Sequence, residues 1–190
     1  MNVVEQILIK DLKLSDEMYD RFMNLSGTKH LKKKDYFVQE GKVCHHLGIV
    51  ESGALRSFVE KEGEEHIKDF YFRGSMVVSF GSFLSGEPCT GNIQALEETT
   101  LITLSRTAYH QLLNESVEWY KFVNYILFFF LSRKCPRETS FLTDDAYERY
   151  KLLLKTHPHI EQLVSQHHIA SYLGIKPESL SRLKNLNIHQ

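Results

Sequence analysis

The stretch SQHHIASYLGIKPESLSRLKNL (residues 165–186) contains two short helical patterns joined by a tight turn. Ile169 and Leu173 are four residues apart, so they share one face of the first helix. Gly174 suits the left-handed conformation that ends many helices. Pro177 is well tolerated in the first turn of the next helix. The pattern therefore predicts two helices that meet at a fixed angle.

The second of these helices has an apolar side and a polar side. Leu180 and Leu183 point back at the first helix, and the small Ala170 allows the two helices to approach closely. This is the arrangement of a helix-turn-helix, whose second helix enters the major groove of DNA. An ordinary pair of packed helices shares the same apolar spacing and is the alternative interpretation.

The polar side chains of this stretch have the chemistry of DNA recognition. Arg182 can donate two hydrogen bonds to guanine O6 and N7, and Glu178 can accept one from cytosine N4. Side chains at the start of the first helix can hold a phosphate beside free backbone N–H groups. The candidate DNA-binding residues are Ser165, Gln166, Lys176, Glu178, Ser179, Ser181, Arg182 and Lys184.

The overall composition is that of an ordinary globular protein. The chain has 190 residues and a formal net charge of -1, so any surface for nucleic acid must be local. Its three cysteines, Cys44, Cys89 and Cys135, are scattered, which fits a reducing compartment and argues against a disulfide framework or a clustered-cysteine metal site. We find no signal-peptide pattern and no apolar run long enough to span a membrane, and we expect a cytoplasmic protein without a membrane partner.

The region before residue 113 has the pattern of short antiparallel strands. Segments such as HLGIVES, ALRSFVE, IKDFYF and TTLITLS are rich in β-branched and aromatic residues. Glycines that suit turns with positive φ separate these segments. They are Gly41, Gly53, Gly63, Gly74, Gly86 and Gly91. The segment KEGEEH (residues 61–66) is a good hairpin tip, so we expect an antiparallel β-roll or sandwich.

Residues 116–134 predict a long helix that is apolar around most of its circumference. Ser116 can cap its start, and neither proline nor glycine interrupts it. One apolar stripe contains Trp119, Phe122, Ile126 and Phe130, and a neighbouring stripe contains Tyr120, Val123, Leu127 and Leu131. Such a helix must be covered on more than one side. It is either buried within a monomer or forms a dimer seam, and the seam explains the surplus aromatic surface better.

The remaining residues predict further helices and complete the domain organisation. Asp144 and Asp145 favour a helix start, and an apolar face follows at Tyr147, Tyr150, Leu153 and Leu154. We expect an α+β fold in which a jelly-roll-like antiparallel β-roll with flanking helices precedes a dimerisation helix and a helix-turn-helix domain. The expected boundaries are residues 1–115 for a sensor domain, 116–137 for the dimerisation or linker helix, and 138–190 for DNA binding.

This order of elements resembles the Crp/Fnr family of bacterial transcription regulators over nearly the whole chain. Residues 32–77, KKKDYFVQEGKVCHHLGIVESGALRSFVEKEGEEHIKDFYFRGSMV, resemble the family's cyclic-nucleotide-binding-type roll. ERYKLLLKTHPHI and IASYLGIKPESLSR are similar to the branch found in Bacteroidetes-type bacteria. The resemblance implies a homodimer that recognises a palindromic DNA site, with Glu178 and Arg182 as readers, and that contacts RNA polymerase.

The effector pocket departs from the family pattern. Members that bind cyclic AMP use a glutamate for the ribose and an arginine, followed by serine or threonine, for the phosphate. Ser79 stands at the glutamate position and Cys89 and Thr90 at the arginine–serine pair. No lysine or arginine occurs between Arg73 and Arg106, so a buried phosphate would lack a compensating cation. We expect an unidentified effector other than cyclic AMP, bound near these three residues, and we predict no cofactor.

Two further departures concern the DNA-reading end. The family's additional recognition arginine is replaced by Pro177, so we expect a different target site. Only six residues follow Lys184, so a β-hairpin wing is truncated or missing. This shortening and the near-neutral charge leave a second interpretation open, a ligand-sensing or interaction module that no longer reads DNA.

The third interpretation, and the weakest, is a cupin-like metalloenzyme that uses His45, His46 and Glu51. Adjacent residues of a strand point to opposite faces, so both histidines cannot easily enter one barrel interior. We therefore expect no metal site and no enzyme.

Overall fold

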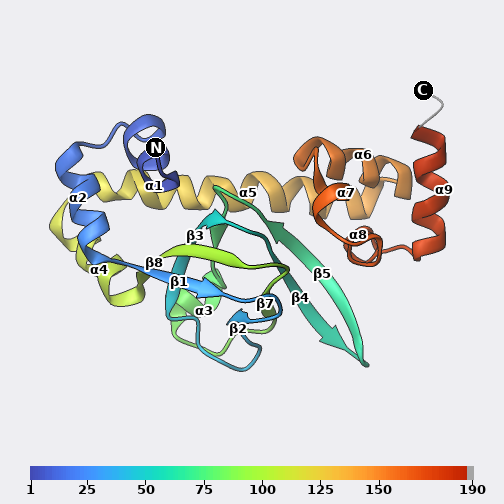
Figure 1. Cartoon of the computed structure of the whole chain (residues 1–190), viewed down its shortest axis with the longest axis horizontal. Coiled ribbons are helices and arrows are strands. Elements are labelled where there is room, and N and C mark those ends of the chain that lie inside the picture. The colour runs from blue at the N-terminus through green and yellow to red at the C-terminus, as the bar shows by residue number, and fades with distance from the viewer. Residues whose placement is uncertain (188–190) are drawn as a thin grey trace. The chain divides into compact units, whose positions relative to one another are not determined.

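The computed structural model describes residues 1–187, with side chains to residue 185, and the chain forms two compact units (Figure 1). The first unit contains Met1–Ser57 and Phe70–Phe128. The second contains Phe58–Asp69 together with the chain from Phe129 onward. The second unit therefore combines part of a hairpin from the strand region with the C-terminal helices. The predicted domain boundaries at residues 115 and 137 remain a prediction.

The strand region folds into two antiparallel four-stranded sheets, as the sequence predicts. Their orders are β1-β8-β3-β6 and β2-β7-β4-β5. The strands are β1 (Ser26–Leu31), β2 (Tyr36–Val38), β3 (His46–Ser52), β4 (Leu55–Lys61), β5 (Glu64–Tyr71), β6 (Met76–Val77), β7 (Asn92–Ala95) and β8 (Thr99–Ser105). Short helices accompany them: α1 (Val3–Glu5), the π-helix η1 (Gln6–Asp11), α2 (Asp16–Leu25), α3 (Phe80–Ser85) and α4 (Arg106–Glu115).

Close packing in the first unit explains why β3 contains a glycine. A Cβ atom on Gly48 would lie 3.0 Å from Leu101 Cδ2 and 3.2 Å from Cε2 of Phe37. Phe37 belongs to β2 and Leu101 to β8, so residues of both sheets fill the space beside β3. Only a residue without a side chain leaves room for this ring, which makes Gly48 a packing residue.

Positive φ angles form the turns at most of the predicted glycines. Gly63 has φ +80° and Glu62 has φ +56°, so the β4–β5 hairpin turns through two left-handed residues. This is the geometry that matches the twist of the flanking strands, and it confirms the predicted tip at residues 61–66. Gly41, Gly53, Gly74 and Gly86 also have positive φ, whereas Gly91 does not.

The predicted long helix exists but is longer than expected. A 3-10 turn, η2 (Val117–Trp119), leads into α5 (Tyr120–Thr143), which passes through Pro136 instead of ending near it. Proline cannot donate the backbone hydrogen bond that would support this turn. The turns after Pro136 gain other contacts, because Arg137 bonds to backbone carbonyls outside its helix and Ser140 is buried. These contacts explain why the helix continues to Thr143.

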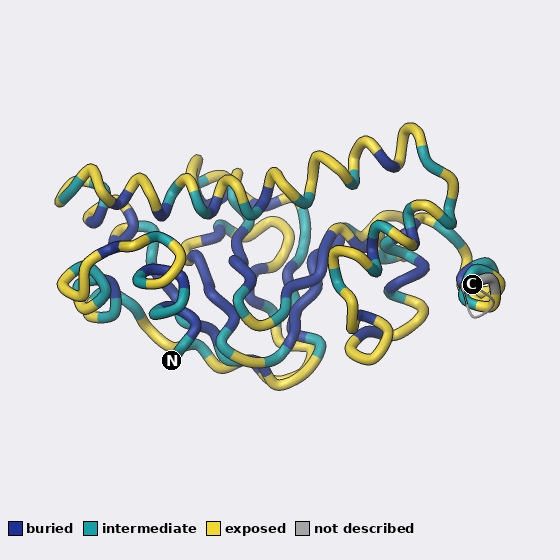
Figure 2. Tube along the Cα trace, turned by 90° about the horizontal axis from the view of Figure 1, so that it is seen from above, coloured by how far each residue is buried: buried dark blue, intermediate teal, exposed yellow. Residues whose placement is uncertain are grey.

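Burial separates the two apolar stripes of this helix. Trp119, Phe122, Ile126 and Phe130 are buried, and Phe122 contacts Phe22 of α2 edge to face with ring centroids 5.4 Å apart. Tyr120, Leu127 and Leu131 of the second stripe are exposed. Figure 2 shows this alternation of buried and exposed residues along α5. Phe128 adds to the exposed apolar surface, with 72% of its area accessible.

Four further helices complete the second unit. They are α6 (Ala146–Thr156), α7 (Ile160–Leu163), α8 (Gln166–Leu173) and α9 (Pro177–Asn187). Asp145 caps α6, as the sequence predicts, because its Oδ1 accepts hydrogen bonds from the backbone N–H groups of Tyr147 at 2.8 Å and Glu148 at 3.0 Å. The prediction of a truncated or missing wing concerns residues 185–190: residues 185–187 belong to α9, and residues 188–190 lie outside the described part of the chain.

Among residues 1–187, no helix combines the length and the apolar character that crossing a bilayer requires. The same residues contain no cluster of three potential metal ligands.

Candidate nucleic-acid interface

The α8–α9 pair is held by backbone and cap hydrogen bonds at its turn. Ser165 caps α8, because its Oγ accepts a hydrogen bond from the backbone N–H of His168 at 3.3 Å. Gly174 ends α8 with φ +67°, and the next N–H group, that of Ile175, donates to the Ala170 carbonyl at 3.0 Å. This is the glycine-ended helix terminus that the sequence predicts. Pro177 begins α9, also as predicted.

The apolar residues of the pair are buried as their spacing predicts. Ile169, Ala170, Leu173 and Leu180 are all almost completely buried. Leu183 is half-buried. Burial of Leu180 fixes which side of α9 faces inward, so the residues on its other side must face outward.

The outward side of α9 contains most of the predicted readers. Glu178, Ser181 and Arg182 are exposed, and Lys176 in the preceding turn is exposed as well. Glu178 and Arg182 are four residues apart and therefore neighbours on the helix surface. Ser165 and Gln166 at the start of α8 are exposed, whereas Ser179 is half-buried.

Lys184 differs from the other predicted DNA-binding residues because its ammonium group has an intramolecular partner. Its Nζ lies 2.7 Å from Oε1 of Glu161 in α7, and 21% of the lysine side chain is exposed. The same carboxylate oxygen accepts a hydrogen bond from the Tyr150 hydroxyl at 2.8 Å. Burial opposes ionisation of Glu161, but its bonds with Lys184 and Tyr150 hold the pKa of this carboxyl below its usual value.

Two arginines stabilise the C-terminal end of α8. Arg137 donates from Nη2 to the Tyr172 carbonyl at 3.0 Å, and Arg149 donates from Nε to the Leu173 carbonyl at 3.1 Å. Both guanidinium groups lie near the Phe141 ring, at 4.6 Å and 4.9 Å from its centroid. Cations are favourable at this negative end of a helix dipole. The two guanidinium groups therefore stabilise the turn after α8 through contacts within the protein.

The β4–β5 hairpin contacts α8 within the second unit. The Ser171 hydroxyl accepts a hydrogen bond from the Ile67 N–H at 3.1 Å and donates one to the Glu65 carbonyl at 2.7 Å. Arg137 donates to the Ile67 carbonyl at 3.3 Å. β5 is the last strand of its sheet order, so these side chains satisfy backbone groups on a sheet edge.

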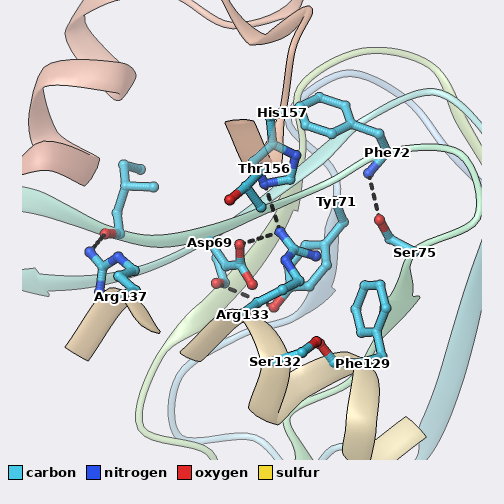
Figure 3. A network of polar contacts seen from close by, with 12 residues as sticks. Asp69, Tyr71, Phe72, Ser75, Phe129, Ser132, Arg133, Arg137, Thr156 and His157 are labelled. Atoms are coloured by element: carbon cyan, nitrogen blue, oxygen red, sulfur yellow. Dashed lines mark hydrogen bonds and ion pairs between the residues drawn. The ribbon is translucent and has the colours of Figure 1, made fainter. Parts of the chain in front are cut away.

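A second polar group links the same hairpin to α5 and α6 (Figure 3). Arg133 Nη2 lies 2.6 Å from Oδ1 of Asp69, and both side chains are largely buried. Nε2 of His157, at the end of α6, lies 2.8 Å from the same arginine nitrogen. Burial first, and the charge of Arg133 second, lower the pKa of His157 to about 4. The imidazole is therefore neutral near pH 7 and can accept the arginine hydrogen bond.

The three predicted effector-pocket residues lie in different environments. Ser79 is half-buried and immediately precedes α3. Cys89 is buried, and its thiol donates to the Gln39 carbonyl at 2.9 Å, whereas Thr90 is exposed. Neither Cys89 nor Thr90 supplies a positive charge, so these side chains offer hydrogen bonds alone.

The residues of the metalloenzyme alternative have other surroundings. His45 and His46 are both exposed and therefore do not enter the roll. Glu51 accepts a hydrogen bond from the backbone N–H of Val3 at 3.0 Å and pairs with Arg73 at 3.4 Å. Its carboxylate thus has a structural explanation.

Comparison with known protein families identifies the strand region. Residues 28–116 match the family model of the cyclic nucleotide-binding domain. This match covers seven of the eight strands completely, together with most of β1 and all of α4. A search of curated protein sequences found no match.

Solved structures share the fold of nearly the whole chain. A mutant of CooA from Carboxydothermus hydrogenoformans has a TM-score of 0.72 and 18% identity, covering 94% of this chain and 82% of its own. FixK2 from Bradyrhizobium japonicum has the same TM-score and identity, covering 85% and 83%. The catabolite activator protein of Thermus thermophilus has a TM-score of 0.57 and 18% identity, covering 93% and 84%. These structural neighbours are Crp/Fnr-type regulators, and the Bacteroidetes-type branch stays a prediction.

Sequence reasoning missed several residues that organise the second unit. Glu161, Ser171, Arg137 and Asp69 have ordinary surface-type chemistry and belong to no recognisable motif. Ser171 and Ile67 are 104 residues apart, so no local pattern could associate them. Arg133 and Arg137 are four residues apart and therefore lie on the same face of one helix. This spacing was the available signal for Arg137, because both cations then face the same neighbouring segment.

Proposed function

We propose that this protein is a homodimeric, sequence-specific DNA-binding transcription regulator of the Crp/Fnr type, acting in the cytoplasm. In this proposal α8 and α9 form a helix-turn-helix, and the β-roll binds an effector other than cyclic AMP. Two copies read the two halves of a palindromic site and contact RNA polymerase. The match of residues 28–116 to a cyclic nucleotide-binding domain supports the sensing role.

One observation carries the DNA-reading proposal. Leu180 is completely buried, while Glu178, Ser181 and Arg182 on the remaining surface of α9 are exposed. An exposed guanidinium beside an exposed carboxylate can read a guanine and a cytosine in the major groove.

The exposed stripe of α5 supports pairing of two chains. Leu131 is 57% exposed and Phe128 is 72% exposed, and they are three residues apart on one helix. A contiguous apolar surface of this kind is typical of protein interfaces. A second copy of α5 would cover it with an equivalent apolar surface, as in a two-fold symmetric interface.

The contacts of β5 with α8 support a path from sensor to reader. β5 belongs to the matched cyclic nucleotide-binding domain, and its Ile67 and Glu65 backbone groups bond to Ser171 in the first helix of the proposed reader. An effector that changes the hairpin changes these bonds. It can shift the equilibrium between two arrangements only if it binds them with unequal affinity.

Mapping of bound sites in the genome, followed by titration of the recovered sequence, tests the proposal. The wild-type protein should protect a palindromic site and prefer it to random DNA, and Arg182→Ala should remove this preference. Equal binding of all sequences by the wild type would contradict the proposed function.

The second candidate is a sensing or interaction module that does not read DNA. It is favoured by the internal use of Arg137, Arg149 and Lys184, which reduces the charge available for phosphates. In that case the wild type would bind no DNA under conditions in which it is folded and dimeric.

A further inference from the structure

One carboxylate connects three helices of the second unit. Glu161 Oε1, in α7, accepts a hydrogen bond from the Tyr150 hydroxyl of α6 at 2.8 Å. The same oxygen lies 2.7 Å from Nζ of Lys184 in α9. The sequence predicted a contact between Lys184 and DNA, whereas the structure pairs its ammonium group with Glu161.

The degree of burial of the three side chains favours these contacts with one another. Tyr150 is 2% exposed, so its hydroxyl depends on a partner inside the protein. Lys184 has 21% of its side chain exposed, which limits its reach toward a ligand. Glu161 is 36% exposed and can therefore ionise, and its bonds with the other two groups favour the charged form.

Lys184 lies on α9 one turn beyond Leu180 and on the same inward side of the helix, whereas Arg182, two residues away, lies on the opposite side. Burial of Leu180 sets which side of α9 faces inward, but apolar packing is not directional and tolerates small rotations about the helix axis. An ion pair at a second point on the helix opposes that rotation. The two contacts together determine the direction in which Glu178 and Arg182 point.

We propose that Glu161 is a positioning residue for DNA reading, which fixes the rotation of α9 by holding Lys184, and that Lys184 is not a phosphate contact. The proposal rests on the proposed function, because it assigns the way in which the reading edge of α9 is oriented. Tyr150 in turn fixes the carboxylate of Glu161.

The two possible roles of Lys184 predict opposite effects of neutralising Glu161. A lysine that contacts phosphate would be released by Glu161→Gln, so binding to all DNA would strengthen and depend more steeply on salt. Each phosphate contact adds about 0.9 to the slope of log affinity against log salt concentration, or about 1.8 for a dimer. A positioning lysine adds nothing to that slope, and Glu161→Gln weakens the preference for the cognate site.

The experiment compares wild type with Glu161→Gln, Lys184→Gln and the double variant, by salt titration on the recovered operator and on random DNA. Glutamine at 161 can still accept the Tyr150 hydrogen bond, so this variant removes the ion pair alone. Circular dichroism establishes that each variant is folded. Arg182→Gln is the reference for a direct contact.

We expect each single variant to reduce the preference for the operator about tenfold while its salt slope stays at the wild-type value. The double variant should lose no more than either single variant, because both remove the same ion pair. Tighter binding of random DNA by Glu161→Gln, a slope about 1.8 shallower in Lys184→Gln, or additive losses in the double variant would each overturn the inference.

A measurement without DNA separates this inference from the proposed function. Should the wild type prefer no DNA sequence, the regulator proposal fails, but hydrogen exchange in the free protein still tests the role of Glu161. The amides of α9 should exchange faster in Glu161→Gln and Lys184→Gln than in wild type. In Arg182→Gln their exchange rates should equal those of wild type. Equal exchange in wild type and Glu161→Gln would overturn the inference.

Discussion

Ser171 bonds to the backbone of Ile67 as a neighbouring β-strand would. Its hydroxyl accepts from the Ile67 N–H at 3.1 Å and donates to the Glu65 carbonyl at 2.7 Å. One side chain therefore satisfies both a donor and an acceptor on the edge of β5. This gives the first helix of the proposed reader a specific attachment to a strand of the matched cyclic nucleotide-binding domain.

Replacing Ser171 by alanine tests this attachment. The variant removes the hydroxyl that bonds to the Ile67 N–H and the Glu65 carbonyl, so the free energy of unfolding should fall by about 1–3 kcal/mol. Chemical denaturation measures the change. Ser132→Ala is the matched control, because the exposed Ser132 hydroxyl bonds to the Phe129 carbonyl of its own helix. A loss as small as that of the control would contradict the importance of the bridge.

Arg182 and Lys176 should affect DNA binding in different ways. Arg182→Ala should cost about 1–3 kcal/mol at the operator and relax the preference at one base pair, because a base contact is lost. Lys176→Ala should weaken binding to every sequence and reduce the salt slope by about 1 for each contact. Fluorescence anisotropy with operator and random duplexes measures both effects. Sequence preference that survives Arg182→Ala would exclude direct reading by this residue.

Charges on the exposed stripe of α5 should separate a dimer into monomers. A double variant with Phe128→Glu and Leu131→Glu would bury two carboxylates in the seam, which is unfavourable without partners. Sedimentation equilibrium should then give the monomer mass, whereas wild type gives twice that mass. Leu163→Glu is the control, because Leu163 is 49% exposed but lies on α7. Dimers of the double variant would place the seam elsewhere.

Stability should depend on pH through His157. The folded chain has a His157 pKa of about 4, below its usual value of 6.5, because of burial and the Arg133 charge. Between pH 6.5 and 4 the unfolded chain therefore binds more protons, so the free energy of unfolding falls as the pH falls. In His157→Gln the amide can still accept from Arg133 but does not titrate. Wild type should lose up to about 3 kcal/mol more than this variant across that window.

Urea denaturation at several pH values between 7 and 4 measures the difference between the two proteins. Curves that remain parallel would show that His157 is protonated as readily in the folded chain as in the unfolded one. The substitution leaves the Asp69–Arg133 ion pair in place, so the comparison isolates the imidazole.

Cyclic AMP should not stabilise this protein. The predicted pocket residues Cys89 and Thr90 carry no positive charge, so a cyclic phosphate would be desolvated without compensation. A ligand present at 100 times its dissociation constant raises the free energy of unfolding by about 2.7 kcal/mol. Thermal unfolding with 1 mM cyclic AMP, about 100 times a dissociation constant of about 10 μM, should give an unchanged melting temperature. A clear increase would refute the prediction.

Local patterns were sufficient to predict several elements of the chain. Gly63 indicated the hairpin, Asp145 the start of α6, and Gly174 with Pro177 the turn between α8 and α9. Each of these residues acts on its own backbone within a few positions. Such local backbone preferences depend on a few consecutive residues, so they can be predicted from the sequence.

Contacts between distant segments could not be predicted in the same way. The position of Lys184 in the sequence predicted a contact with DNA. Its pairing with Glu161 depends instead on how α7 packs relative to α9. The helix around Pro136 was expected to end near residue 134, and contacts of Arg137 with Ile67 and Tyr172 favour its continuation. Tertiary packing overrode the local preference at both places.

If two chains pair through the apolar stripe of α5, the cellular abundance of the protein becomes a regulatory variable. In a chain that pairs through Phe128 and Leu131, the amount of assembled regulator rises with the square of the monomer level when monomers predominate. Doubling expression would then quadruple promoter occupancy at low levels, before any effector is bound. The level of synthesis would act as an input beside the chemical signal.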